Sequence, residues 1–198
     1  MRKLSPLVLI FACLTLTQCN SQEKKTAYNP EAIQLNNKAI GFFRIQNYDS
    51  ALVYLDKAIN IDSTYYTAYS NKCEVYCALK DFQKALIESQ KAVAVKPDLA
   101  EGWTFTGMLY DKTGDAADAL KCYRKSIELF DERISNPAKQ KSLEANKLNR
   151  ALSLILMGQE ETGRKELKKL KEAYPNDNTL DGFLNLTKKE YLDQLFDD

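Results

Sequence analysis

Three carboxylates, Glu74, Glu101 and Asp111, are the side chains in this sequence that could perform acid–base chemistry together. A pair of neighbouring carboxyl groups can act as general acid and general base. The sequence contains no histidine, which excludes histidine-dependent triads and histidine metal ligands. It also has no nucleophile motif and no glycine-rich phosphate loop, and acidic side chains on an exposed face are usually solvated charges. We therefore predict that the protein is not an enzyme and uses no cofactor or metal ion.

Three cysteines, Cys73, Cys77 and Cys122, follow the N-terminal region. Cys73 and Cys77 are four residues apart, which on one helix is a weak signal for metal or redox chemistry. No histidine and no further cysteine cluster supports that signal. Because cysteine is small and often buried, we favour packing in the core over a disulfide or a metal site.

The residues named so far lie in a stretch, residues 32–133, in which one pattern recurs every 34 residues. Alanine marks one position of this pattern at Ala51, Ala85 and Ala119. Large side chains mark two further positions, at Leu35, Tyr69 and Trp103 and at Phe42, Tyr76 and Tyr110. A fixed period of roughly 20 to 50 residues is typical of a solenoid built from one repeated unit. Only 7 glycines and 5 prolines in 198 residues indicate a chain that is mostly helix.

The pattern resembles the tetratricopeptide repeat, in which each unit is a pair of antiparallel helices, A and B. Three units fit, at residues 32–65, 66–99 and 100–133, with small residues at positions 8, 20 and 27. Larger residues stand at positions 4 and 11 and, in the first and third units, at position 24. The resemblance implies an all-α fold, a right-handed α-solenoid of antiparallel helix pairs. In such a fold, the small residues let helices A and B approach closely, and the large ones fill the gaps between units.

A divergent fourth unit fits residues 144–177 when Pro175 is placed at position 32, so the solenoid would span residues 32–177. Ten extra residues, 134–143, precede it. We expect them to lengthen helix B of the third unit and helix A of the fourth into an overhanging hairpin. Residues 178–198 carry apolar side chains at helical spacing and are expected to form one capping helix. The side chains expected to pack inside the hairpin are Phe130, Ile134 and Leu143.

The N-terminus combines a basic start with about 14 mostly apolar residues, too few to span a bilayer and typical of a secretory signal. The segment Leu16-Thr17-Gln18-Cys19 resembles the bacterial lipoprotein box, although Gln18 stands where a small residue is usual. The resemblance implies that residues 1–18 are removed, that Cys19 is lipidated, and that residues 19–31 form a flexible tether. A secretory signal cut elsewhere is the alternative.

Acyl chains on Cys19 would hold the exported protein on a bacterial envelope membrane. Asn20 is not the aspartate that resembles an inner-membrane retention signal, which favours the outer membrane. Removal of Arg2 and Lys3 with the signal would reduce the 28 basic residues to 26, against 27 acidic ones. This balance predicts no broad electrostatic attraction for nucleic acid.

In this family helix A lines the concave face, so the resemblance implies a groove that would bind a partner. The side chains that line the groove would change along the chain, from a mixture of apolar and polar ones, through polar and acidic ones, to apolar ones. Its apolar end is either open to a partner or covered by the terminal helix. The candidate groove residues are Ile33, Asn36, Ile40, Phe43, Arg44, Thr67, Ser70, Glu74, Glu101, Thr104, Met108, Asp111, Lys112, Leu148, Leu152 and Ile155.

Some members of this family hold the acidic C-terminus of cytosolic chaperones with a clamp of five side chains. Here only Asn71 matches that clamp, and Asn36, Ile40, Glu101 and Phe105 occupy its other positions. The resemblance therefore does not extend to chaperone tails as partners.

The function that these features predict is a non-catalytic, lipid-anchored scaffold or adaptor that binds a protein or peptide partner at the cell envelope. The alternative is an envelope module that binds a glycan or small ligand through Trp103, Tyr69 and Phe43. Trp103 and Tyr69 lie at position 4, which packs between helices in this family. We therefore favour the adaptor.

Overall fold

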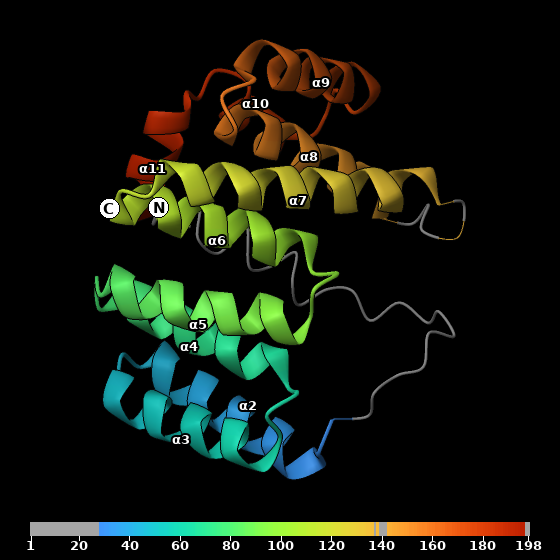
Figure 1. The fold of residues 1–198 in the computed structure, drawn as a ribbon. Helices are drawn as coiled ribbons and strands as arrows, with labels where there is room; N and C mark the ends of the chain where they lie inside the picture. The colour runs from blue at the N-terminus through green and yellow to red at the C-terminus, as the bar shows by residue number, and fades with distance from the viewer. Residues whose placement is uncertain (1–27, 137, 139–141, 197–198) are drawn as a thin grey trace. The chain divides into compact units, whose positions relative to one another are not determined.

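The computed structural model describes residues 28–136, 138 and 142–196, and the regular secondary structure of these residues is entirely helical (Figure 1). The predicted signal peptide and lipidation site, and most of the predicted tether, lie outside the described residues. The helices are α2 (Pro30–Arg44), α3 (Tyr48–Ile61), α4 (Tyr66–Ala78), α5 (Phe82–Val95), α6 (Ala100–Thr113), α7 (Ala116–Ser135), α8 (Leu143–Leu156), α9 (Glu160–Ala173), α10 (Asn178–Phe183) and α11 (Lys188–Phe196). Among these helices, none combines the length and the hydropathy that a bilayer-spanning segment needs.

The described chain divides into two compact units, residues 28–113 and 114–196. In residues 28–113, α2 pairs with α3, α4 pairs with α5, and α6 packs on α5. The small residues predicted to let the helices approach are buried, including Ala39 at 1% exposure and Ala51 and Ala58 at 0%. These positions confirm the helix-pair arrangement that the period of 34 residues predicts.

The turn between helices A and B places one residue in the left-handed backbone region in every unit. These residues are Gln46 (φ 60°), Lys80 (φ 58°), Gly114 (φ 93°) and Gly158 (φ 92°). In the first three units the next residue caps helix B, and its side chain accepts a hydrogen bond from the backbone N–H three residues further on. The turn therefore uses a positive φ in every unit, and glycine is its least strained residue.

Replacing Gln46 with glycine is expected to raise the free energy of unfolding by about 0.5–1 kcal/mol, because glycine adopts positive φ without steric strain. Gln34→Gly is the matched control, since Gln34 is exposed within α2. That substitution should lower the free energy of unfolding by about 1 kcal/mol. Urea denaturation measures both changes, and a destabilised Gln46→Gly variant would contradict the turn geometry.

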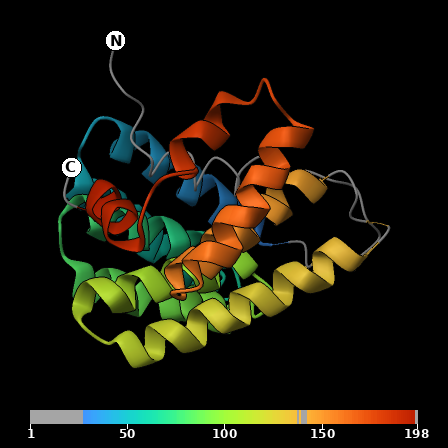
Figure 2. The same cartoon turned by 90° about the horizontal axis from the view of Figure 1, so that it is seen from above.

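Helix α7 is the longest helix of the described chain, with 20 residues where α3 and α5 have 14 each (Figure 2). It ends at Ser135, and Asn136, which precedes a proline in the sequence, is extended (ψ 112°). Helix α8 begins at Leu143 and has 14 residues, an ordinary length for a helix A. The insertion thus lengthens helix B of the third unit, as expected, but not helix A of the fourth.

The C-terminal segment differs from the single capping helix that the apolar spacing suggests. It forms two short helices, α10 and α11, separated at residues 184–187. The second helix begins because Thr187 and Glu190 form a capping box: Thr187 N–H donates to Glu190 Oε2 (2.8 Å), and Glu190 N–H donates to Thr187 Oγ1 (3.2 Å). These two hydrogen bonds stabilise a new helix start at Lys188.

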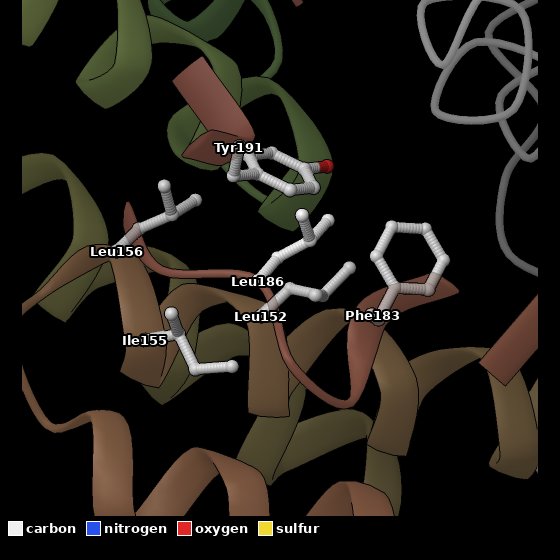
Figure 3. Close-up of a pocket in the computed structure, with 6 residues that line it drawn as sticks. All are labelled: Leu152, Ile155, Leu156, Phe183, Leu186 and Tyr191. Carbon is white, nitrogen blue, oxygen red and sulfur yellow. The ribbon is translucent and has the colours of Figure 1, made fainter. Parts of the chain in front are cut away.

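Two basic side chains of α9 hold this terminal segment in place. Lys171 forms an ion pair with Asp181 of α10 (2.9 Å), and Arg164 donates to the backbone carbonyl of Leu186 (3.3 Å). Side chains of the segment then face the apolar side of α8. The facing sets are Phe183, Leu186 and Tyr191 on the segment and Leu152, Ile155 and Leu156 on α8 (Figure 3).

Candidate functional site

The candidate groove residues of residues 28–113 come from the helices A, namely α2, α4 and α6. Helices α2 and α4 are joined by a hydrogen bond in which the Asn71 amide donates to Asn36 Oδ1 (2.7 Å). Asn36 is 1% exposed, so it belongs to this contact and not to an open surface. Asn71, the one side chain that matches the chaperone-tail clamp, is therefore already bonded to a neighbour within the chain.

Four candidate groove residues are buried, which corrects their assignment to an open surface. Asn36 is held between α2 and α4, and Met108 is fully buried. Leu152 and Ile155 are 7% and 3% exposed because the terminal segment covers them. The covered alternative therefore holds for the apolar end of the groove, where only Leu148 remains half-buried.

The other candidates keep a solvent-accessible part. On α2 the apolar side chains Ile33, Ile40 and Phe43 are half-buried, and Arg44 is exposed. The polar and charged candidates on α4 and α6 are all half-buried. They are Thr67, Ser70, Glu74, Glu101, Thr104, Asp111 and Lys112.

Glu74 is the most unusual group among these candidates. It forms no hydrogen bond or ion pair with any residue that the structure describes, and burial raises its pKa to about 7. No neighbouring charge contributes to this shift. Two carboxyl groups that share a proton would shift each other through their charges. The carboxylates considered for acid–base chemistry therefore do not form such a pair around Glu74.

The raised pKa of Glu74 predicts a dependence of stability on pH. Between about pH 4.5 and 7 the folded chain keeps a proton on Glu74 that the unfolded chain has released, so stability is lost as pH rises through this window. Glu74→Gln removes this loss. Its free energy of unfolding should exceed that of the unsubstituted chain by about 2 kcal/mol more at pH 8 than at pH 4.5.

Urea denaturation at both pH values measures this difference. Glu161→Gln is the control, since Glu161 is exposed on α9, and it should leave the pH profile unchanged. If Glu74→Gln follows the same profile as the unsubstituted chain, the carboxyl group is not desolvated.

A second charged group links three helices of residues 28–113, and sequence reasoning missed it. Lys72 of α4 lies 2.7 Å from Asp56 of α3 and 3.4 Å from Glu88 of α5. Glu88 is 5% exposed and also contacts Lys91 (2.9 Å), while its Oε2 atom has no hydrogen-bond partner among the residues that the structure describes. Lys72 and Asp56 belong to different units of the repeat, so the spacing within one unit gives no signal for their contact.

The cysteines and the aromatic side chains proposed for ligand binding are engaged in the fold. Cys73, Cys77 and Cys122 are free and buried, and burial raises the pKa of the Cys73 thiol well above its usual range. Tyr69 is 9% exposed, and Trp103 donates from Nε1 to the carbonyl of Pro97 (2.9 Å). These contacts favour structural roles for the side chains over a glycan-binding platform.

Two family models of the tetratricopeptide repeat match the chain, one at residues 100–132 and one at residues 146–177. The first match falls in the third predicted unit, and the second falls in the divergent fourth unit. Both therefore support the tetratricopeptide repeat family.

Known proteins with similar sequences include the heat shock protein sti1 homolog of Schizosaccharomyces pombe, which is 31% identical over 97 residues, 49% of this chain and 16% of that protein. The Hsp70-Hsp90 organizing protein of Triticum aestivum is 29% identical over 87 residues, 44% of this chain and 15% of that protein. The chain thus spans about a sixth of the length of these relatives.

Among solved structures, PilW, described as a widely conserved type IV pilus biogenesis factor, aligns with a TM-score of 0.55 and 24% identity. The alignment covers 74% of this chain and 64% of PilW. This likeness concerns the fold alone.

Proposed function

We propose that the protein is a non-catalytic adaptor that binds a protein or peptide segment on the helix A face of residues 28–113. The observation that carries this proposal is the difference in burial between the side chains of α2. Its alanines Ala32 and Ala39 are buried in the core at 0% and 1% exposure, and the half-buried Ile33 and Phe43 pack against that core. Ile40 is half-buried without packing against it. Apolar surface beyond what the core uses tends to mark an interface.

The charge of this face limits the chemical class of segment that it can bind. The relatives include an Hsp70-Hsp90 organizing protein, but four of the five side chains of a chaperone-tail clamp are missing here, and the fifth, Asn71, is bonded to Asn36. The candidates on this face carry three acidic side chains, Glu74, Glu101 and Asp111, against two basic ones, Arg44 and Lys112. Glu74, whose pKa burial raises to about 7, has no partner in the described chain. The face therefore suits a segment that carries an apolar side chain and a basic group, and not an acidic tail.

Photo-crosslinking tests the adaptor function directly. A photoreactive residue at Ile40 or Thr67 should give one discrete protein adduct in cells, because both side chains are partly accessible on helices A. Val53 and Ile87 are matched controls on helices B, with 51% and 49% exposure. Adducts from the control positions alone, or none from Ile40 and Thr67, would contradict the proposal.

We also propose that lipid on Cys19 anchors the adaptor to a bacterial envelope membrane, the outer membrane being favoured. The support is the sequence Leu16-Thr17-Gln18-Cys19 after a short apolar run. Mass spectrometry of the mature N-terminus should find acylated Cys19, and Cys19→Ser should release the protein from the membrane fraction. A mature N-terminus that begins at an unmodified residue other than Cys19 would contradict the anchor.

A further inference from the structure

The added turns of α7 create a cleft in residues 114–196 that the repeat alone would not form. The cleft has a volume of about 370 Å³ and is lined by α7, α8 and α9. Helix α7 is longer than α3 and α5, which have 14 residues each, and Asp131 and Ile134 of the cleft wall lie in its additional C-terminal part. Two of the three helices are helices B, so the cleft is separate from the helix A face of the proposed function.

The two acidic groups of this cleft are paired with one arginine. The Arg150 guanidinium donates from Nε to Asp131 of α7 and from Nη1 to Glu166 of α9. Both partners raise the pKa of Arg150, opposing its burial. Arg150 therefore fixes α7 against α9, and its single positive charge offsets one of the two negative charges.

Two further lysines bring the cleft to three cationic side chains against two acidic ones, a net charge of +1. Lys147 of α8 and Lys169 of α9 line the cleft, are exposed, and form no ion pair with any residue that the structure describes. Beside them lie Ile134, half-buried, and Tyr174, 41% exposed. The cleft thus combines an apolar wall with a net positive rim.

We propose that this cleft is a second docking site, which binds an acidic peptide segment through an apolar side chain flanked by carboxylates. The apolar side chain enters between Ile134 and Tyr174, and the carboxylates pair with Lys147 and Lys169. Such pairs add specificity and speed the encounter, while the apolar anchor limits dissociation. The site is independent of the proposed helix A face, so either can fail without the other.

The test uses the purified full chain and a fluorescent synthetic peptide, acetyl-Asp-Glu-Asp-Phe-Leu-Glu-Asp-Glu-amide, followed by fluorescence anisotropy. The peptide should bind, and added salt should weaken the binding. The double substitution Lys147→Glu with Lys169→Glu should reduce the affinity at least about tenfold, since both contacts become repulsive. Tyr174→Ser should reduce it by about threefold or more, through loss of the apolar wall.

The matched control is Lys165→Glu with Lys168→Glu, which makes the same charge change at exposed positions of α9 outside the cleft. It should change the affinity by less than about twofold. Circular dichroism must show that every variant keeps the helix content of the unsubstituted chain.

Three results would overturn the proposal. One is equal loss of affinity in the two double variants, and another is equal binding of a peptide whose acidic residues are replaced by lysine. The last is that the cleft binds a different occupant. Binding to anionic lipid vesicles without binding to the peptide would show a lipid site, and a dimer in sedimentation that Lys147→Glu with Lys169→Glu dissociates would show a contact between two copies of the chain.

Discussion

Replacing Tyr191 with alanine is expected to lower the free energy of unfolding by about 3–4 kcal/mol. The Tyr191 ring is 6% exposed, contacts Phe183 with ring centroids 6.1 Å apart, and faces Leu152 and Ile155 of α8. Its loss leaves a cavity and opens the apolar side of α8 to water. Urea denaturation followed by circular dichroism measures the change.

Tyr191→Phe is the control for this prediction, because it keeps the ring and removes only the hydroxyl. Tyr191 is 6% exposed, and burial raises its pKa. The phenylalanine variant should therefore stay within about 1 kcal/mol of the unsubstituted chain. An alanine variant that unfolds at the same urea concentration as the unsubstituted chain would show that α11 does not cover α8.

Replacing Gly163 with alanine is expected to lower the free energy of unfolding by about 2–3 kcal/mol. A Cβ atom at Gly163 would lie 2.6 Å from the backbone oxygen of Ala151 and 2.6 Å from Ile155 Cγ1. A side chain can rotate away from such a contact, but a backbone carbonyl cannot. The substitution must therefore push α9 away from α8, which thermal or urea unfolding would report.

Gly41→Ala provides the opposite case on the same chain. Gly41 lies within α2, and a Cβ atom there meets nothing within 4 Å. The substitution should raise the free energy of unfolding by up to about 1 kcal/mol, since alanine favours helix. Equal effects of the two substitutions would mean that α8 and α9 do not approach at Gly163.

The repeat could be predicted from sequence because its signals are local and periodic. Ala51 and Ala85 are 34 residues apart, and each is small for the same reason, the close approach of two helices. Gly163 has the same role in the divergent unit. The Ala151 backbone lies so close to it that only a small residue allows α8 and α9 to approach. A pattern of this kind needs no knowledge of distant contacts.

The surface was harder to predict, because exposure depends on elements far away in sequence. Leu152 and Ile155 have the spacing of groove residues, yet the terminal segment covers them. The break in that segment had a local signal, the capping box of Thr187 and Glu190, which apolar spacing alone does not show. Arg150 had no such signal, since its two acidic partners come from other helices.

The central claim is that a partner binds the helix A face of residues 28–113. The most direct test is to titrate the partner identified by crosslinking against four variants of the chain. Isothermal titration calorimetry with Ile40→Glu and Thr67→Glu should show affinities reduced at least about tenfold. Val53→Glu and Ile87→Glu, at exposed positions on helices B, should bind as the unsubstituted chain does. Binding that survives both helix A variants, or is lost in the helix B variants, would contradict a partner held on this face.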